Sequence, residues 1–196
     1  MTVKPHKRLF TALVLLFVLA LPREAGAQRL AVKANALSWA ALAPDLGLEV
    51  VTGERTSIAL SVFGNSFLGM NGYSLLAIQP EFRFWFNGRP LTREYVGVAA
   101  FAAQYDLSVP SGADRANVFR GDGIAAGLSG GYVFNLGKRF NFELSGGTGL
   151  LLFRQKQYFE QDNYEELFTD GRTEANTWGI KLFPVKLAAT FIYIIK

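Results

Sequence analysis

Residues 76–86, LAIQPEFRFWF, separate into two sets when every second residue is taken. One set is apolar and consists of Leu76, Ile78, Pro80, Phe82, Phe84 and Phe86. The other set carries an amide, a carboxylate and a guanidinium, on Gln79, Glu81 and Arg83. Because successive side chains of a β-strand point to opposite faces, the pattern predicts a strand with one apolar and one polar face. Its length of roughly ten residues suits a tilted strand that crosses a bilayer, so an outer-membrane β-barrel is the leading interpretation.

The same two-residue period recurs along the chain and predicts about eight strands. We expect them at residues 30–39, 46–51, 56–64, 76–86, 95–107, 123–135, 140–153 and 183–196. Short connections alternate with longer polar ones at 106–122 and 154–177. Outer-membrane barrels have short periplasmic turns and longer external loops. We therefore predict an all-β, eight-stranded antiparallel up-and-down transmembrane β-barrel whose two termini are periplasmic. In the last strand, the pattern places Val185 on the apolar face, opposite Lys186.

Residues 1–27 have the pattern of a cleaved signal peptide. Basic residues precede an apolar run at positions 9–21, and Ala25-Gly26-Ala27 forms a cleavage site of small residues. The alternative is a membrane anchor, for which the apolar run is short. We expect export through this signal to the outer membrane, and a single β-barrel domain formed by residues 28–196.

The net charge does not indicate a nucleic-acid partner. The chain has 20 basic and 16 acidic residues, a formal charge of +4. Without residues 1–27 it has 16 basic and 15 acidic residues, so the charge falls to +1. A nearly neutral domain lacks the basic surface that nucleic-acid binding requires. We expect outer-membrane lipid and the barrel-assembly machinery as its partners instead.

The absence of two residue types excludes several kinds of catalytic and metal site. The chain has no cysteine, and its one histidine is His6, within the expected signal. Serine–histidine and cysteine–histidine nucleophiles and the usual zinc sites are therefore excluded from residues 28–196. We expect a protein that is not an enzyme, with no catalytic residue and no cofactor.

The alternation does not decide which face points outward. A soluble, lipocalin-like periplasmic barrel would place the aromatic residues inside, around an apolar ligand. Three features favour lipid on the apolar face: its bulky uncharged side chains, the glycines on the opposite face, and the aromatic residues near predicted strand ends. Membrane insertion is the preferred interpretation, with the soluble carrier as the alternative.

Several sequence blocks resemble a family of small outer-membrane β-barrels common in Bacteroidota, a domain of unknown function. The blocks are VKANALSWA (32–40), PDLGLE (44–49), QPEFRFWF (79–86), AAQYDL (102–107), LGKRFNFE (136–143) and FIYIIK (191–196). The resemblance implies a barrel similar in architecture to OmpA and OmpX. It also implies a link to the fimbria-like surface proteins near which such barrels are often encoded. It supplies no catalytic residue.

Six charged residues fall on the polar faces of the predicted strands. They are Lys33, Glu49, Glu81, Arg83, Glu143 and Lys186, and we call them the lumen charge network. Three are basic and three acidic, and buried charges need partners. We interpret the set as a network that packs a narrow lumen, in preference to an ion or proton path.

Two further functions of acidic residues are weaker interpretations. Glu81 and Glu143 resemble the carboxylate pair of a glycosidase, but neighbouring basic residues keep both ionised and no cleft is indicated. The acidic loop at 155–177 offers oxygen ligands for calcium but lacks the EF-hand spacing. We therefore expect no metal site.

Two other features carry expectations. Aromatic residues of the last long loop are candidates for binding a partner or for packing over the barrel mouth. They are Tyr158, Phe159, Tyr164 and Phe168. Pro80 lies in mid-strand and lacks a backbone N–H, so we expect a bulge or an irregular register there.

Overall fold

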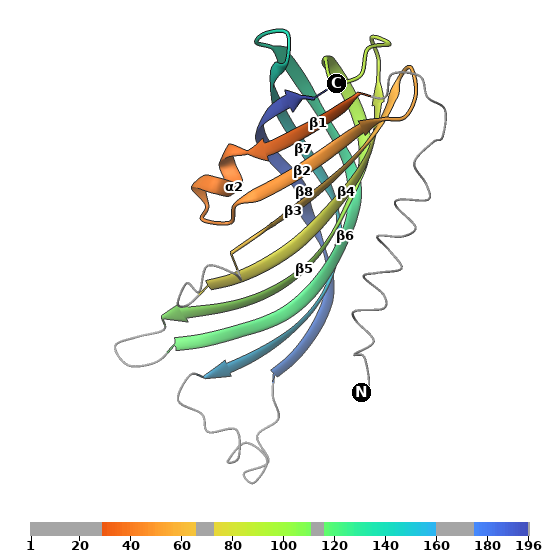
Figure 1. Ribbon diagram of the computed structural model, residues 1–196. Helices are drawn as coiled ribbons and strands as arrows, with labels where there is room; N and C mark the ends of the chain where they lie inside the picture. The colour runs from red at the N-terminus through yellow and green to blue at the C-terminus, as the bar shows by residue number, and fades with distance from the viewer. Residues whose placement is uncertain (1–28, 66–72, 111–115, 160–174, 196) are drawn as a thin grey trace, which may run out of the picture.

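The structure is a computed structural model that describes residues 29–65, 73–110, 116–159 and 175–195 (Figure 1). Its elements are β1 (Leu30–Asn35), α2 (Ala36–Ala40), β2 (Asp45–Val51), β3 (Thr56–Gly64), β4 (Tyr73–Trp85), β5 (Arg93–Pro110), β6 (Ala116–Asn135), β7 (Phe140–Phe159) and β8 (Ala175–Ile194). Within these four stretches, no helix is long and apolar enough to cross a membrane.

The strands form a closed antiparallel barrel in sequence order. Each strand pairs with the next, and β1 also pairs with β8 from Ala31↔Ile194 to Asn35↔Thr190. The prediction of an all-β fold with eight antiparallel up-and-down strands is therefore confirmed.

The apolar side of the alternation faces outward. On β4, Glu81, Arg83 and Trp85 are buried, whereas Phe82 and Phe84 are exposed. Glycine is required at one point where β6 and β7 face each other. A Cβ atom on Gly149, which pairs with Gly127, would collide with the carbonyl oxygen of Ala126. Glycine therefore allows these two strands to approach each other.

β1 is shorter than predicted. It ends at Asn35, and residues 36–40 form α2 instead of continuing the strand to residue 39. The Asn35 side chain ends the strand, because its Oδ1 accepts hydrogen bonds from the N–H groups of Leu37 (3.1 Å) and Ala189 (3.0 Å). Asparagine is a favoured helix N-cap for this reason. Trp39 consequently lies on a helix at the barrel rim, where it is exposed.

β5 to β8 are longer than predicted, with 18 to 20 residues each. The predicted loops at 106–122 and 154–177 were therefore too long. Apolar alternation stops in the extensions of β5–β7, where outward ion pairs connect neighbouring strands. In the extension of β8 it continues through the exposed Trp178, Ile180 and Leu182. Arg120 Nη2 lies 2.5 Å from Asp106, and Arg154 Nη2 lies 2.9 Å from Asp122. The barrel wall is consequently taller along β5–β8 than along β1–β3 (Figure 1).

The bulge lies at another proline than predicted. The register across Pro80 is unbroken, because Ile78↔Ala102 and Glu81↔Ala99 belong to the same alignment. The register shifts instead between Gly147↔Lys186 and Gly149↔Phe183, so that two residues of β8 oppose one residue of β7. Pro184 is one of those two, in agreement with the preference of proline for bulges.

The bulge also reverses the facing of Val185. Val185 and Lys186 are neighbours in the chain, yet both are buried inside the barrel. The prediction that Val185 lies on the outward apolar face was therefore wrong. An extra residue in one strand shifts its alternation by one position, and the alternation alone does not show where that happens.

Candidate functional site

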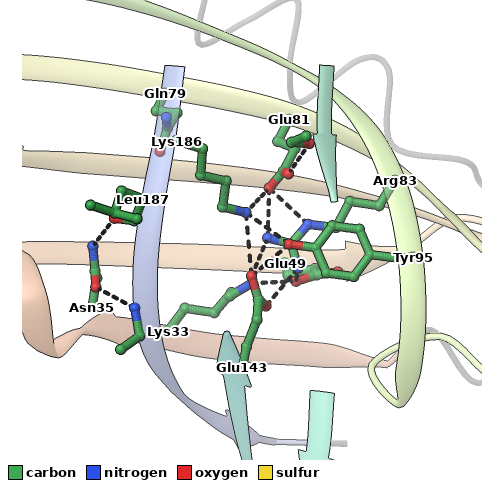
Figure 2. Close-up of polar contacts among 12 residues, drawn as sticks. Lys33, Asn35, Glu49, Gln79, Glu81, Arg83, Tyr95, Glu143, Lys186 and Leu187 are labelled. Atoms are coloured by element: carbon green, nitrogen blue, oxygen red, sulfur yellow. Dashed lines mark hydrogen bonds and ion pairs between the residues drawn. The ribbon is translucent and has the colours of Figure 1, made fainter. Parts of the chain in front are cut away.

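All six residues of the lumen charge network meet inside the barrel (Figure 2). They come from β1, β2, β4, β7 and β8, and none is more than 8% exposed. The inward positions of the strands bring these residues together although they are far apart in the sequence. Lys33 and Glu143, for example, are separated by 110 positions.

Arg83 contacts all three carboxylates. Its Nη1 lies 2.9 Å from Glu49 Oε2 and 2.9 Å from Glu143 Oε2. Its Nε and Nη2 lie 2.8 and 2.6 Å from Glu81 Oε2. The guanidinium is a planar fork of donors, and this geometry allows one cation to bind several carboxylates. Arg83 is therefore the central cation of the network.

The two lysines bridge pairs of carboxylates on either side of Arg83. Lys33 Nζ lies 2.9 Å from Glu49 and 2.6 Å from Glu143. Lys186 Nζ lies 2.6 Å from Glu81 and 3.3 Å from Glu143. Each carboxylate is thus shared by at least two cations, and the three positive and three negative charges balance.

Neutral side chains from the remaining three strands complete the network. Ser57 of β3 donates to Glu49 Oε1 (2.6 Å), and Ser129 of β6 donates to Glu81 Oε1 (2.6 Å). The Tyr95 hydroxyl of β5 donates to Glu143 Oε1 (2.7 Å) and accepts from Lys186 (3.0 Å). Every strand of the barrel therefore contributes at least one side chain.

Sequence reasoning missed these three neutral partners. Ser57 and Ser129 do lie on predicted polar faces, which was an available signal. Tyr95 is one of the aromatic residues near predicted strand ends, which predicts a place in an outer aromatic girdle, and that prediction was wrong because Tyr95 is buried. Its ring packs under the Arg83 guanidinium at 4.4 Å and against Trp85 at 4.9 Å. Its role comes from contacts between distant strands.

The network leaves no carboxylate available for chemistry. Each of the six carboxylate oxygens accepts at least one hydrogen bond from a cation or a hydroxyl. The residual space around the network is about 20 Å³. That space holds about one water molecule. Glu81 and Glu143 therefore lie in a packed interior and not in a cleft.

An apolar cluster closes the barrel on the side of the short turns. Leu91, in the turn between β4 and β5, is fully buried at a positive φ of 70°. The Asn141 side chain holds this turn by donating to the Leu91 carbonyl oxygen (2.7 Å). The cluster contains Ala31, Trp85, Leu91, Tyr95, Val133 and Ile192.

A cavity of about 520 Å³ lies on the other side of the network. Lys186 belongs to both its lining and the network, so the network forms part of the cavity floor. Aromatic and aliphatic side chains make up much of the wall, among them Phe63, Leu75, Phe101, Leu151, Phe153 and Phe183. Pockets that bind small molecules have this volume and this apolar lining.

The predicted partner-binding aromatics fall in two groups. Tyr158 and Phe159 belong to β7 and not to a loop. Tyr164 and Phe168 lie outside the described residues, as does most of the acidic segment considered for calcium. Among the residues that the structure describes, no group of three or more acidic or histidine side chains is arranged to hold a metal ion.

The chain belongs to a family of proteins of unknown function, DUF3575, which it matches over residues 12–195. The resemblance to a domain of unknown function is therefore confirmed. No curated protein and no solved structure matches the chain.

Proposed function

We propose that this DUF3575 protein is a non-enzymatic outer-membrane β-barrel with a packed polar lumen. It acts in envelope structure or in surface recognition through its external loops, with fimbria-like surface proteins as the candidate partners. Residues 1–27 serve as a cleaved signal peptide, and both termini face the periplasm. The proposal includes an origin of the Bacteroidota type and an architecture like that of OmpA and OmpX.

The observation that carries the proposal is the uncharged outer face of the strands. The outward-facing residues of β6 and β7 are the even-numbered ones of 124–134 and 140–152, and none of them is charged. Leu128, Leu144 and Leu150 are between 48% and 70% exposed. A soluble barrel would expose such side chains to water at a high cost, since each buried leucine-sized side chain contributes about 1.5–3 kcal/mol. Contact with lipid removes that cost.

Charged residues bound this apolar face at both ends. The Arg120–Asp106 and Arg154–Asp122 pairs lie beyond it toward the long strand ends, and Glu94 and Arg139 lie at the turn end. The segment between Glu94 and Asp106 has 11 residues and that between Arg139 and Arg154 has 14, enough for the roughly 9–11 residues that a tilted transmembrane strand requires. The apolar band therefore has the height expected of a bilayer-spanning barrel.

Aromatic side chains gather along the turn end of the band. The ring centroids of three tilted pairs lie close together: Tyr132 and Phe134 at 4.6 Å, Phe142 and Phe191 at 5.3 Å, and Phe140 and Tyr193 at 4.9 Å. Outer-membrane barrels carry aromatic girdles at both interfaces. Exposed Trp39 and Trp178 supply tryptophans toward the opposite rim.

The packed lumen supports a role that requires neither transport nor catalysis. The apolar cluster and the lumen charge network close the barrel in succession between the short turns and the cavity. Residues 28–196 also lack histidine and cysteine. Activity then depends on what the barrel presents at its rim.

Fractionation of cells that express the full chain tests the location. We expect recovery in outer membranes after washing with high salt and with alkaline carbonate, and faster gel migration of the unheated protein. The N-terminal sequence of the recovered protein should begin at Gln28. Recovery in the soluble periplasmic fraction would support the lipocalin-like alternative instead.

A further inference from the structure

The barrel wall is interrupted beside β8. β1 pairs with residues 190–194 of β8, whereas β8 begins at Ala175. Within the described part of the chain, residues 175–189 of β8 thus have no strand on their β1 side. Figure 1 shows β8 continuing well past the ends of β1 and β2. We call this the β8 gap. The cavity reaches it, since Ser38 on one side and Leu187 on the other belong to the cavity lining.

Side chains form hydrogen bonds with the β8 backbone in the part of the gap next to the cavity. Gln79 Nε2 reaches across the lumen to the Val185 carbonyl oxygen, 2.6 Å away. Asn35 donates to the Leu187 carbonyl oxygen (3.4 Å) and accepts from the Ala189 N–H (3.0 Å). Unpaired backbone groups are costly next to lipid. These two amides satisfy three backbone groups at residues 185–189, the part of the gap next to the cavity.

Exposed apolar side chains border the gap on both sides. On β8, Leu182 and Leu187 are 74% and 72% exposed. On the facing side, Leu37, Trp39 and Leu46 are also exposed. The gap therefore opens within the apolar band, and in the proposed membrane orientation it opens toward lipid.

Two lysines line the cavity, and only one of them forms an ion pair with a described carboxylate. Lys181 Nζ lies 4.4 Å from the centre of the Phe153 ring, and no described carboxylate forms an ion pair with it. Lys186 is engaged by Glu81 and Glu143. The acidic residue of the lining, Asp45, accepts a hydrogen bond from the Asn35 N–H (2.5 Å). Among the described residues, the cavity thus combines an apolar interior with one cation, Lys181, that forms no ion pair, and one carboxylate, Asp45, that accepts a backbone N–H.

We propose that this cavity binds a single-chain anionic amphiphile of the fatty-acid type, which enters from the membrane through the β8 gap. The carboxylate of this amphiphile pairs with Lys181, and its hydrocarbon chain lies among Phe101, Phe153 and Phe183. The route through the gap rests on the membrane location proposed above. The volume of about 520 Å³ lies within the roughly 300–1,000 Å³ of ligand pockets.

The probes are palmitate and the uncharged hexadecanol. The barrel is held in nanodiscs with a bound fluorescent fatty acid, and the affinity of each probe is measured by its displacement of that fatty acid. Lys181→Met should lower the affinity for palmitate about tenfold or more, because a charge-assisted contact is lost. The affinity for hexadecanol should not change. Lys138→Met, at the opposite end of the barrel, should change neither affinity. Equal palmitate affinity in the wild type and Lys181→Met would overturn the assignment of the carboxylate to Lys181.

Filling the cavity with a larger side chain tests whether the hydrocarbon chain of the ligand lies there. Ala103 lines the cavity, whereas its neighbour Ala102 points outward. Ala103→Phe should abolish the binding of both probes, and Ala102→Phe should retain it. Unheated gel mobility verifies that each variant is folded. Binding that survives in folded Ala103→Phe overturns the proposal that the cavity is the site.

The entry route is tested with a bulky thiol reagent, because the chain has no cysteine of its own. Leu187→Cys places the label at the gap, and Leu128→Cys places it at an equally exposed outward position of β6. Only the label at residue 187 should slow the transfer of palmitate from vesicles. Equal rates overturn entry through the gap. Palmitate binding by a protein recovered as soluble refutes the membrane location alone, whereas a membrane-inserted barrel that binds no palmitate refutes only this inference.

Discussion

Arg83 and Glu143 meet inside the barrel in a two-point contact, with Nη1 at 2.9 Å from Oε2 and Nη2 at 3.1 Å from Oε1. They lie on β4 and β7, 60 positions apart, and both are buried. A bidentate arginine–carboxylate pair fixes orientation as well as distance. The pair therefore ties opposite parts of the wall together and makes the interior sensitive to the loss of either partner.

Arg83→Ala should destabilise the barrel by roughly 3–5 kcal/mol, because it leaves buried carboxylates without their shared cation. The measurement is the urea dependence of unfolding, followed by the heat-modifiable shift in gel mobility. Arg154→Ala is the control, since it removes an exposed ion pair that contributes about 0–1 kcal/mol. Equal and small effects of the two substitutions would mean that Arg83 is not buried and that the facing of β4 is inverted.

Tyr95→Phe isolates the hydroxyl from the ring. The variant keeps the packing against Arg83 and Trp85 but loses the hydrogen bonds with Glu143 and Lys186. Hydrogen bonds to charged groups contribute about 1.5–3 kcal/mol, so we expect a loss in that range in the same urea assay. Tyr132→Phe changes the same group on the outer face and should have little effect. A loss as large from Tyr132→Phe would contradict the special role of Tyr95.

Much of the fold was predictable because one face of each strand is apolar and the other is not. β3 was predicted at its observed bounds, and the facing of Ser57, Glu81 and Glu143 follows from the two-residue period. The period also predicts which charges share the interior. It does not predict their partners, because the contact of Arg83 with Glu143 depends on how strands 60 positions apart are aligned.

The errors have local causes that apolar alternation does not report. Asn35 ends β1 through side-chain hydrogen bonds that compete with the sheet. The extensions of β5–β7 continue the backbone pairing with outward charged pairs such as Arg154–Asp122 in place of apolar side chains, so the apolar pattern stops before the strands do. At Val185, one extra residue in β8 reverses the facing. Each case depends on contacts with a neighbouring element, and the two-residue period of the strand itself does not predict them.

The purified barrel should give no large, steady conductance in planar bilayers. An ion would have to pass the Leu91 cluster and then the lumen charge network, around which only about 20 Å³ of space remains. An eight-stranded barrel has an interior that side chains nearly fill. A porin inserted under the same conditions provides the positive control. Steady openings that Arg83→Ala alters would show that the network gates a pore, contrary to the proposal.

If the lumen neither conducts nor catalyses, surface activity must reside in the connections at the tall rim of the barrel. β7 ends at Phe159 and β8 begins at Ala175, so residues 160–174 can be replaced by a short turn without shortening either strand. Loop length contributes little to closure entropy, so insertion and the gel-mobility shift should be retained. Binding to surface partners, or any adhesion phenotype of the cells, should be lost. Replacing residues 111–115 in the same way controls for a general disturbance of the rim. A trimmed barrel that folds and keeps the full phenotype would leave a structural role in the envelope as the remaining function.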